Sequence, residues 1–182
     1  DVGRDERARL EDGTAFGGDG GRIEDAVARR TSAAVALVAR DMRPSGVALT
    51  EAFAQGVRSQ GLDVVDLGLG STDLLYFASG SMDAPGAMFT ASHNPAQYNG
   101  AKFCMAGARP VGEDTGLGRI LEVGNASLAG SVAPSGTEGS LEHTDVLDAF
   151  AAHVRSFVDV AALRPLKVVA DTANGMGGLV VP

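Results

Sequence analysis

The sequence predicts an α/β protein with a layered mixed β-sheet flanked by helices. Two observations indicate this fold class. Short apolar runs alternate with longer segments whose apolar residues recur every three or four positions, as expected for strands and amphipathic helices in turn. The chain also holds 25 glycines among its 182 residues, which suits a protein with many turns better than a helical bundle.

The first elements can be placed from their apolar patterns. The charged, Gly-rich opening of the chain predicts no regular element, and a short helix is expected over 23–33. The unbroken apolar run 35–39 predicts a strand that is buried on both faces, as in a parallel sheet. A helix is expected over 47–59, with Ser45 as a candidate N-cap and Gly61 at its C-terminal end.

The middle of the chain continues this alternation. The further expected elements are strands at 62–67, 86–90 and 102–105 and helices at 72–80 and 114–123. Residues 124–140 are rich in Gly, Ser, Ala and Pro and predict a surface loop.

The C-terminal part predicts the beginning of a second unit. A longer helix is expected over 145–159, and the apolar run 166–171 predicts a buried strand that leads into a Gly-rich turn. We therefore expect three parts, in chain order: an N-terminal α/β domain at 1–143, a connecting helix at 144–164, and the truncated start of a second α/β domain at 165–182.

Composition narrows the classes of partner and the compartment. The net charge of −8 repels a nucleic-acid backbone at long range, so no nucleic-acid partner is expected. A single cysteine, Cys104, forms no internal disulfide and suits a reducing cytoplasm. The longest strongly apolar run, 33–39, is far shorter than the ~20 residues of a membrane helix, and no signal peptide opens the chain. A soluble cytoplasmic protein without a membrane partner is the expectation.

A polar string with a serine follows the strand expected at 86–90. It reads Thr-Ala-Ser-His-Asn-Pro, with the serine at Ser92. Open α/β sheets place their sites at the carboxyl ends of strands, and a serine held there can carry a phosphoryl group, because positioning and electrostatics dominate phosphoryl transfer. The residues alone leave open that Ser92 only caps a short helix at 94–97. They support neither an α/β-hydrolase elbow, because there is no Gly-x-Ser-x-Gly, nor a catalytic triad, because no partner acid can be identified.

This string, followed by Tyr-Asn-Gly-x-Lys, is similar to the phosphoserine loop of the α-D-phosphohexomutases, in their phosphomannomutase/phosphoglucomutase branch. Three other segments resemble the family in the same order: the Arg-Asp-Met-Arg-Pro-Ser-Gly turn at 40–46, the strand and turn at 63–73, and the second-domain opening at 164–175. The likeness covers residues 34–182 and corresponds to the N-terminal part of the family's chain.

The resemblance implies a phosphohexose mutase. Such an enzyme is an intramolecular phosphotransferase of the isomerase class, and it moves phosphate between C1 and C6 of mannose or glucose phosphate. Transfer runs through a phosphoserine and a bisphosphorylated sugar, with hexose 1,6-bisphosphate as activator and hexose phosphates as partners. The 182 residues alone are expected to be inactive. Two alternatives stay open: phosphoglucosamine mutase, and a non-catalytic phosphosugar-binding or assembly module.

The resemblance also assigns roles to residues of the serine string. Ser92 is implied to be phosphate donor and acceptor, Lys102 to assist proton transfer or neutralise charge, and His93 to shape the loop and stabilise the phosphate. From the residues alone, a lysine such as Lys102 is more often just an exposed strand residue, and His93 is as readily a structural histidine.

Phosphate-binding roles are implied for Arg43, Asn94 and Arg4. An arginine in a turn is more often simply solvated, which is the alternative for Arg43. Arg4 lies in an opening Asp-Val-Gly-Arg, where the family has Asp-Val-Arg-Gly.

A Mg²⁺ ion is implied as cofactor. In the family it bridges the phosphoserine and an Asp-Gly-Asp-Gly-Asp loop later in the chain, and hard oxygen ligands of this kind suit Mg²⁺. The Gly-Gly-Asp-Gly-Gly string at 17–21 has one aspartate and is rejected as the metal site. Ser92, through its phosphate, is the metal ligand predicted here.

Overall fold

The computed structural model describes residues 35–128, 130, 133–173 and 175–181. The helix expected over 23–33 lies outside these described residues. The elements follow one another as β1 Val35–Arg40, α3 Pro44–Ser59, β2 Asp63–Leu69, α4 Thr72–Met82, β3 Gly86–Phe89, β4 Ala101–Met105, β5 Arg109–Pro110, η2 Glu113–Thr115, α5 Leu117–Leu128, β6 Leu141–His143, α6 Leu147–Arg155, η3 Val160–Ala162 and α7 Gly177–Val180.

The strands form one mixed sheet, as the sequence predicts. Its strand order is β5-β4-β3-β1-β2-β6. The four strands β3, β1, β2 and β6 are parallel, whereas β4 runs antiparallel to both β3 and β5. The central strand β1 is buried from Ala36 to Ala39, which is the expected property of an apolar run with helices on both faces.

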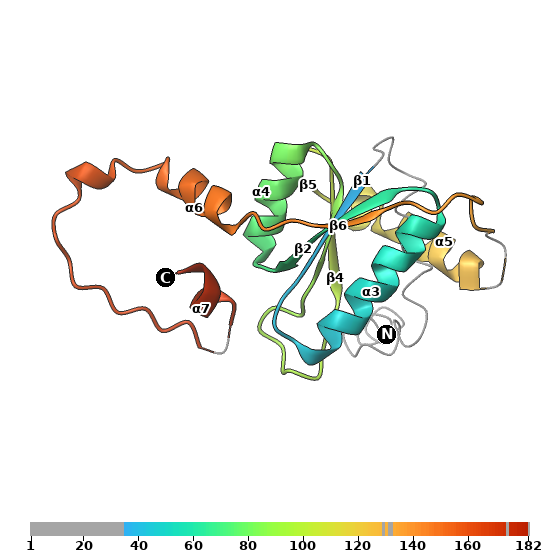
Figure 1. Cartoon of the computed structure of the whole chain (residues 1–182). Coiled ribbons are helices and arrows are strands. Elements are labelled where there is room, and N and C mark those ends of the chain that lie inside the picture. Colours follow the sequence, from blue (N-terminus) through green and yellow to red (C-terminus); the bar gives the residue numbers. More distant parts are fainter. Residues whose placement is uncertain (1–34, 129, 131–132, 174, 182) are drawn as a thin grey trace.

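Helices cover both faces of the sheet, and each face has its own apolar core. Leu49, Phe53 and Val57 of α3 and Ile120 of α5 pack against one face. On the opposite face, α4 and α6 pack through a second cluster that includes Phe150 of α6. Figure 1 shows the sheet edge-on between α4 on one side and α3 with α5 on the other.

The route of the chain brings two loops together at one edge of the sheet. The chain leaves β1 through α3 to reach β2, and it returns over the opposite face through α4 to β3. Because β3 lies on the other side of β1 and pairs with it in parallel, Arg40 and Phe89 are register partners. The segments that follow these two strands therefore emerge side by side, where ligand sites of open α/β sheets lie.

Helix α3 begins earlier than the predicted residue 47, but it ends at Ser59 as predicted. The helix begins at Pro44, inside the expected turn, because the fixed φ of proline suits the first helical position. Ser45 is therefore within the first turn and does not cap the helix, whose N-cap is Arg43. Gly61 follows the helix with a φ of +83°, and its N–H donates to the Arg58 carbonyl, as expected for a C-terminal glycine.

The C-terminal half contains the other differences. Helix α5 extends to Leu128 into the loop expected at 124–140, and α6 is shorter than the predicted helix at 145–159. The strand predicted at 166–171 is wrong, because no described strand pairs with this segment, and Val169 is 86% exposed. In Figure 1 this segment lies apart from the sheet, in the extended stretch that leads to α7. Among the described residues, no helix has the length and apolarity needed to cross a membrane.

The first prediction concerns Phe53, which lies in the core between α3 and the sheet. It is 1% exposed, and its ring meets those of Phe89 and Phe103 at centroid distances of 5.6 and 6.4 Å. Replacing Phe53 with Ala should lower the free energy of unfolding by about 3–5 kcal/mol, because a cavity remains among rings that cannot close it. Urea denaturation measures this, with exposed Phe157→Ala as control; equal effects of the two would contradict the prediction.

The second prediction concerns the thiol of Cys104, which is 2% exposed on β4. Burial raises the pKa of the Cys104 thiol above its ordinary value. The unfolded chain therefore loses this proton first, so stability should fall as the pH rises through the unfolded thiol pKa of about 8.5, by up to about 1.4 kcal/mol per pH unit. Urea denaturation between pH 7.5 and 10 should show this added slope, and Cys104→Ala should lack it. If the stability of the wild type and that of Cys104→Ala fell with pH at the same slope, the prediction would be wrong.

Candidate functional site

The serine string forms a loop that is closed at its base. The loop leaves the sheet at the end of β3 and returns at the start of β4. Its two ends meet where the Thr90 N–H donates to the Gly100 carbonyl at 3.0 Å. The Asp41 N–H donates to the Phe89 carbonyl, also at 3.0 Å, which joins this base to the turn after β1. We call residues 91–99 the serine loop.

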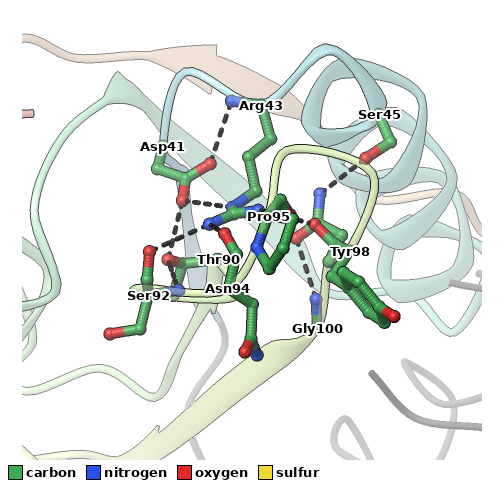
Figure 2. A network of polar contacts seen from close by, with 10 residues as sticks. Asp41, Arg43, Ser45, Thr90, Ser92, Asn94, Pro95, Tyr98 and Gly100 are labelled. Atoms are coloured by element: carbon green, nitrogen blue, oxygen red, sulfur yellow. Dashed lines mark hydrogen bonds and ion pairs between the residues drawn. The ribbon is translucent and has the colours of Figure 1, made fainter. Parts of the chain in front are cut away.

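The Arg43 guanidinium lies inside the serine loop (Figure 2). Its Nε donates to the Asp41 carboxylate at 3.1 Å. Its Nη1 and Nη2 each donate to two backbone carbonyls of the loop. These acceptors, with their distances, are Pro95 (2.7 Å), Tyr98 (2.9 Å), Ser92 (2.9 Å) and Asn94 (2.8 Å). All five N–H donors of the guanidinium thus have protein acceptors, and Arg43 is 8% exposed.

Asp41 and Thr90 complete this network below the loop. The second Asp41 carboxylate oxygen accepts from the Arg43 backbone N–H at 3.0 Å. The Thr90 hydroxyl donates to the Asp41 carboxylate at 2.7 Å and accepts from the Ser92 N–H at 3.0 Å. All three side chains are buried, so the positive charge of Arg43 is balanced by a carboxylate in contact with it.

Ser92 itself is exposed on the outer side of the loop. Its φ of +56° lies in the left-handed region, which is uncommon for a residue other than glycine. Figure 2 shows its carbonyl turned toward Arg43 and its side chain directed away from the guanidinium. The alternative that Ser92 caps a helix at 94–97 is wrong, because this segment forms no helix.

A buried amide fixes the returning side of the loop. Asn99 is 1% exposed, and its side chain donates to the Ser45 hydroxyl at 2.9 Å. The side-chain oxygen of Asn99, Oδ1, accepts from the Gly100 N–H at 2.8 Å. The serine loop is thus attached to the first turn of α3 at a second point, and this contact is the role of Ser45 in the structure.

The outer side of the serine loop borders a cavity of about 450 Å³. Polar residues of the loop and β4 line one wall, and apolar residues of α5 line the other. The lining residues are Thr90, Ala91, Ser92, His93, Asn94, Asn99, Gly100, Ala101, Lys102, Phe103, Leu117, Ile120 and Leu121. The set contains one lysine, one histidine and no carboxylate, although the whole chain is acidic.

The structure brings most of the predicted site residues to this cavity. Ser92, His93, Asn94 and Lys102 all line it, and the Lys102 side chain is exposed. Arg43 lies beneath the loop instead, with its donors already used. Their roles in binding or catalysis stay predictions, and Arg4 lies outside the described residues.

Sequence reasoning assigned no role to three residues that build the site. Asp41, Thr90 and Asn99 are buried polar residues of the network, with exposed fractions of 6%, 8% and 1%. All three lie inside the strings that carried the resemblance. The sequence signal for these residues was their polar character next to buried strands. Their hydrogen-bond partners could not be predicted, because Thr90 and Asn99 bond to residues 49 and 54 positions away.

A metal site is not formed by the described residues themselves. Within this part of the chain, no three or more His, Cys, Asp or Glu side chains gather where a metal ion could bind. The Asp41 carboxylate is occupied by Arg43 and Thr90. The residues present therefore do not fit an independent Mg²⁺ site.

A second, larger cavity lies away from the serine loop. It has about 1030 Å³ and is lined mainly by α4 and α6, including Phe77, Phe150 and His153. The Phe77 ring lies 5.8 Å from that of Phe150 and 5.0 Å from that of His153 between centroids. None of the predicted site residues lines this cavity, so its size does not make it the better candidate.

The comparison with known families points to the same loop. The family model described as "Phosphoglucomutase/phosphomannomutase, alpha/beta/alpha domain I" matches residues 21–122, more than half of the chain. This range includes the serine loop and the turn that holds Arg43.

Known proteins resemble the chain over most of its length. A protein named "Phosphohexose mutases" from Xanthomonas campestris pv. campestris (strain B100) is 39% identical over 88% of this chain and 35% of its own length. A phosphomannomutase of Salmonella montevideo is 38% identical over 78% of this chain and 31% of its own length. The chain thus spans about a third of the relatives it matches.

A solved structure agrees with these relatives. The crystal structure of a phosphoglucomutase/phosphomannomutase family protein from Burkholderia thailandensis has a TM-score of 0.73 and 31% identity, covering 89% of this chain and 35% of that one. Fold, serine loop and sequence agree, and this chain belongs to the phosphoglucomutase/phosphomannomutase family, of which it represents the N-terminal region.

Proposed function

We propose that Ser92 carries a phosphoryl group in a phosphohexose mutase that moves phosphate between C1 and C6 of mannose or glucose phosphate. The observation that carries this proposal is the placement of Ser92, exposed on a loop that Arg43 and Asn99 fix from beneath. The names of the relatives, a phosphohexose mutase and a phosphomannomutase, support the reaction class.

The charges around the cavity support an anionic ligand. Lys102 and His93 line the cavity, and no carboxylate lies among its lining residues. A phosphate next to Ser92 would therefore meet a cation without meeting a fixed negative charge. Since phosphoryl transfer depends mainly on positioning and charge stabilisation, this environment suits a phosphate carrier.

The proposed reaction has two matching halves. In the first, the bond between phosphorus and Ser92 Oγ breaks, a bond to a free hydroxyl of the sugar monophosphate forms, and the hydroxyl proton passes to Oγ. The product is a bisphosphorylated sugar. In the second half, its other phosphate returns to Ser92 Oγ and the proton returns to the sugar oxygen. We propose that Lys102 assists by neutralising charge or relaying this proton, and that His93 and Asn94 stabilise the phosphate.

We propose Mg²⁺ as the cofactor of the complete protein, bound through the phosphate on Ser92. Phosphate oxygens are ligands that Mg²⁺ prefers. Since the described residues form no carboxylate cluster, its other protein ligands would have to come from elsewhere.

Other properties of the complete protein belong to the same proposal. Because the chain spans about a third of its relatives, we propose that these 182 residues carry the donor side of the site and lack turnover alone. Hexose 1,6-bisphosphate would act as activator by transferring phosphate to Ser92. The cytoplasmic location and the absence of a nucleic-acid or membrane partner stay predictions from the sequence.

The prediction for Ser92 uses the protein encoded by the complete reading frame. Incubation with hexose 1,6-bisphosphate should add one phosphate, which tandem mass spectrometry should locate on Ser92. Replacing Ser92 with Ala should remove this phosphate and lower kcat by on the order of 10⁶-fold, the scale expected when a nucleophile is lost.

Ser81→Ala serves as the matched control, because Ser81 is an exposed serine beside the other cavity. Full mutase activity in Ser92→Ala would contradict the proposal. Binding of hexose phosphates by the wild type without phosphorylation would instead favour a non-catalytic phosphosugar-binding module. Turnover with glucosamine phosphate in preference to glucose or mannose phosphate would identify a phosphoglucosamine mutase.

A further inference from the structure

The serine loop is built around a buried cation, and this determines which way its peptide groups face. Four of its carbonyls point at the Arg43 guanidinium, at distances of 2.7–2.9 Å. A guanidinium supplies a rigid, planar fork of donors, so it holds the acceptors in fixed directions. The carbonyl of Ser92 is one of these acceptors.

The direction of the Ser92 carbonyl fixes the direction of the next N–H. The structure has no cis peptide bonds among the residues it describes, and in a trans peptide the C=O and the following N–H point in opposite directions. The His93 N–H therefore points away from Arg43. Figure 2 shows that the Ser92 side chain also lies on the side away from the guanidinium. No hydrogen bond of this N–H to another described residue is found.

We propose that Arg43, held by Asp41, which Thr90 holds in turn, is a positioning residue that turns the Ser92–His93 peptide so that the His93 N–H can bind the phosphate on Ser92. The inference rests on the proposed function of Ser92 and gives Arg43 a different task from direct phosphate binding. Its charge acts through the peptide, because a donor on the carbonyl polarises the N–H at the other end.

The burial of Arg43 and the neutralisation of its charge by Asp41 argue against a direct contact of Arg43 with phosphate. Arg43 is 8% exposed, its five donors are used, and Asp41 neutralises its charge. A phosphate could reach the guanidinium only by displacing loop carbonyls that hold Ser92. Thr90 extends the network to Ser92, because its hydroxyl joins the Asp41 carboxylate to the Ser92 N–H.

The test uses Thr90, which lines the cavity but has its hydroxyl committed inside the network. Thr90→Val in the complete protein removes both hydrogen bonds at nearly unchanged volume, whereas Thr90→Ser keeps them. We expect Thr90→Val to slow single-turnover phosphate transfer from hexose 1,6-bisphosphate to Ser92 by about 10²-fold, the scale of a misplacement near 1 Å. The KM for hexose phosphate should stay within about twofold, because ground-state sugar binding is not altered.

Two controls separate positioning from general damage. Thr50→Val removes the hydroxyl of another buried threonine, one that donates to the Gly46 carbonyl at 2.7 Å, and should leave the rate near that of the wild type. Thr90→Ser should restore most of the rate. Hydrogen exchange of the peptide covering 90–100 should be faster in Thr90→Val and unchanged in Thr50→Val.

Arg43→Lys tests the cation itself, because lysine keeps the charge but has three donors on one nitrogen. If Arg43 positions the loop, Arg43→Lys should lower the rate of phosphate transfer to Ser92 and speed hydrogen exchange of residues 90–100. The KM for hexose phosphate should not change. A raised KM with a loop as protected as in the wild type would identify Arg43 as a phosphate ligand and overturn the inference. Arg58→Lys is the control, since Arg58 also donates to a distant backbone carbonyl, that of Gly139.

The outcomes also distinguish this inference from the proposed function. If the wild type accepts no phosphate on Ser92, the proposed function fails. If the wild type is phosphorylated and Thr90→Val transfers at the same rate with the same exchange, only the positioning role fails. Should Thr90→Val not fold, Arg43→Lys and Asp41→Asn address the same network by the same rate and exchange measurements.

Discussion

The site depends on one contact, the buried Arg43 guanidinium with four backbone carbonyls of the serine loop. In a loop without helix or strand, the peptide groups must find partners among other backbone groups, side chains or water. Here a single side chain supplies partners for the carbonyls, and Asp41 balances the buried charge. A nine-residue segment, 91–99, thereby acquires a defined conformation although it contains no regular element.

The sheet topology is what makes this contact possible. Arg43 and the carbonyls that it binds are separated by 49–55 positions in the sequence. They become neighbours because β3 returns beside β1 and runs in the same direction. The helices between them cover opposite faces, so the edge above β1 and β3 stays open for the two turns. The apolar pattern of the strands therefore positions the polar site indirectly.

The parts that the sequence predicts well are those determined by neighbouring residues. The apolar run of β1 and the glycine after α3 follow from local burial and backbone geometry. The short strands β5 and β6, of two and three residues, carry too little pattern to be recognised. The apolar run 166–171 has the pattern of a strand, yet a strand also requires a partner, and no described residue provides one.

The same reasoning explains why the sequence singles out Ser92 but does not suggest the positioning role that we propose for Arg43. Ser92 lies in a motif of adjacent residues, which can be recognised in the sequence. Arg43 contacts backbone carbonyls, and because every residue has one, the sequence does not indicate which of them it binds. The resemblance implies that Arg43 binds phosphate, and that role stays a prediction. Its burial and its five occupied donors are the observations that favour the positioning role proposed above.

A cation that contacted the phosphate directly would lose and regain this partner in each half of the proposed reaction. A cation enclosed by its own loop keeps its contacts throughout, so the direction of the Ser92–His93 peptide does not depend on whether phosphate is present. The cost of orienting that peptide is then met during folding rather than at the moment of transfer, which is the advantage of a preorganised site. In the proposed mechanism, Arg43 therefore holds the Ser92 carbonyl through a contact that does not involve the ligand.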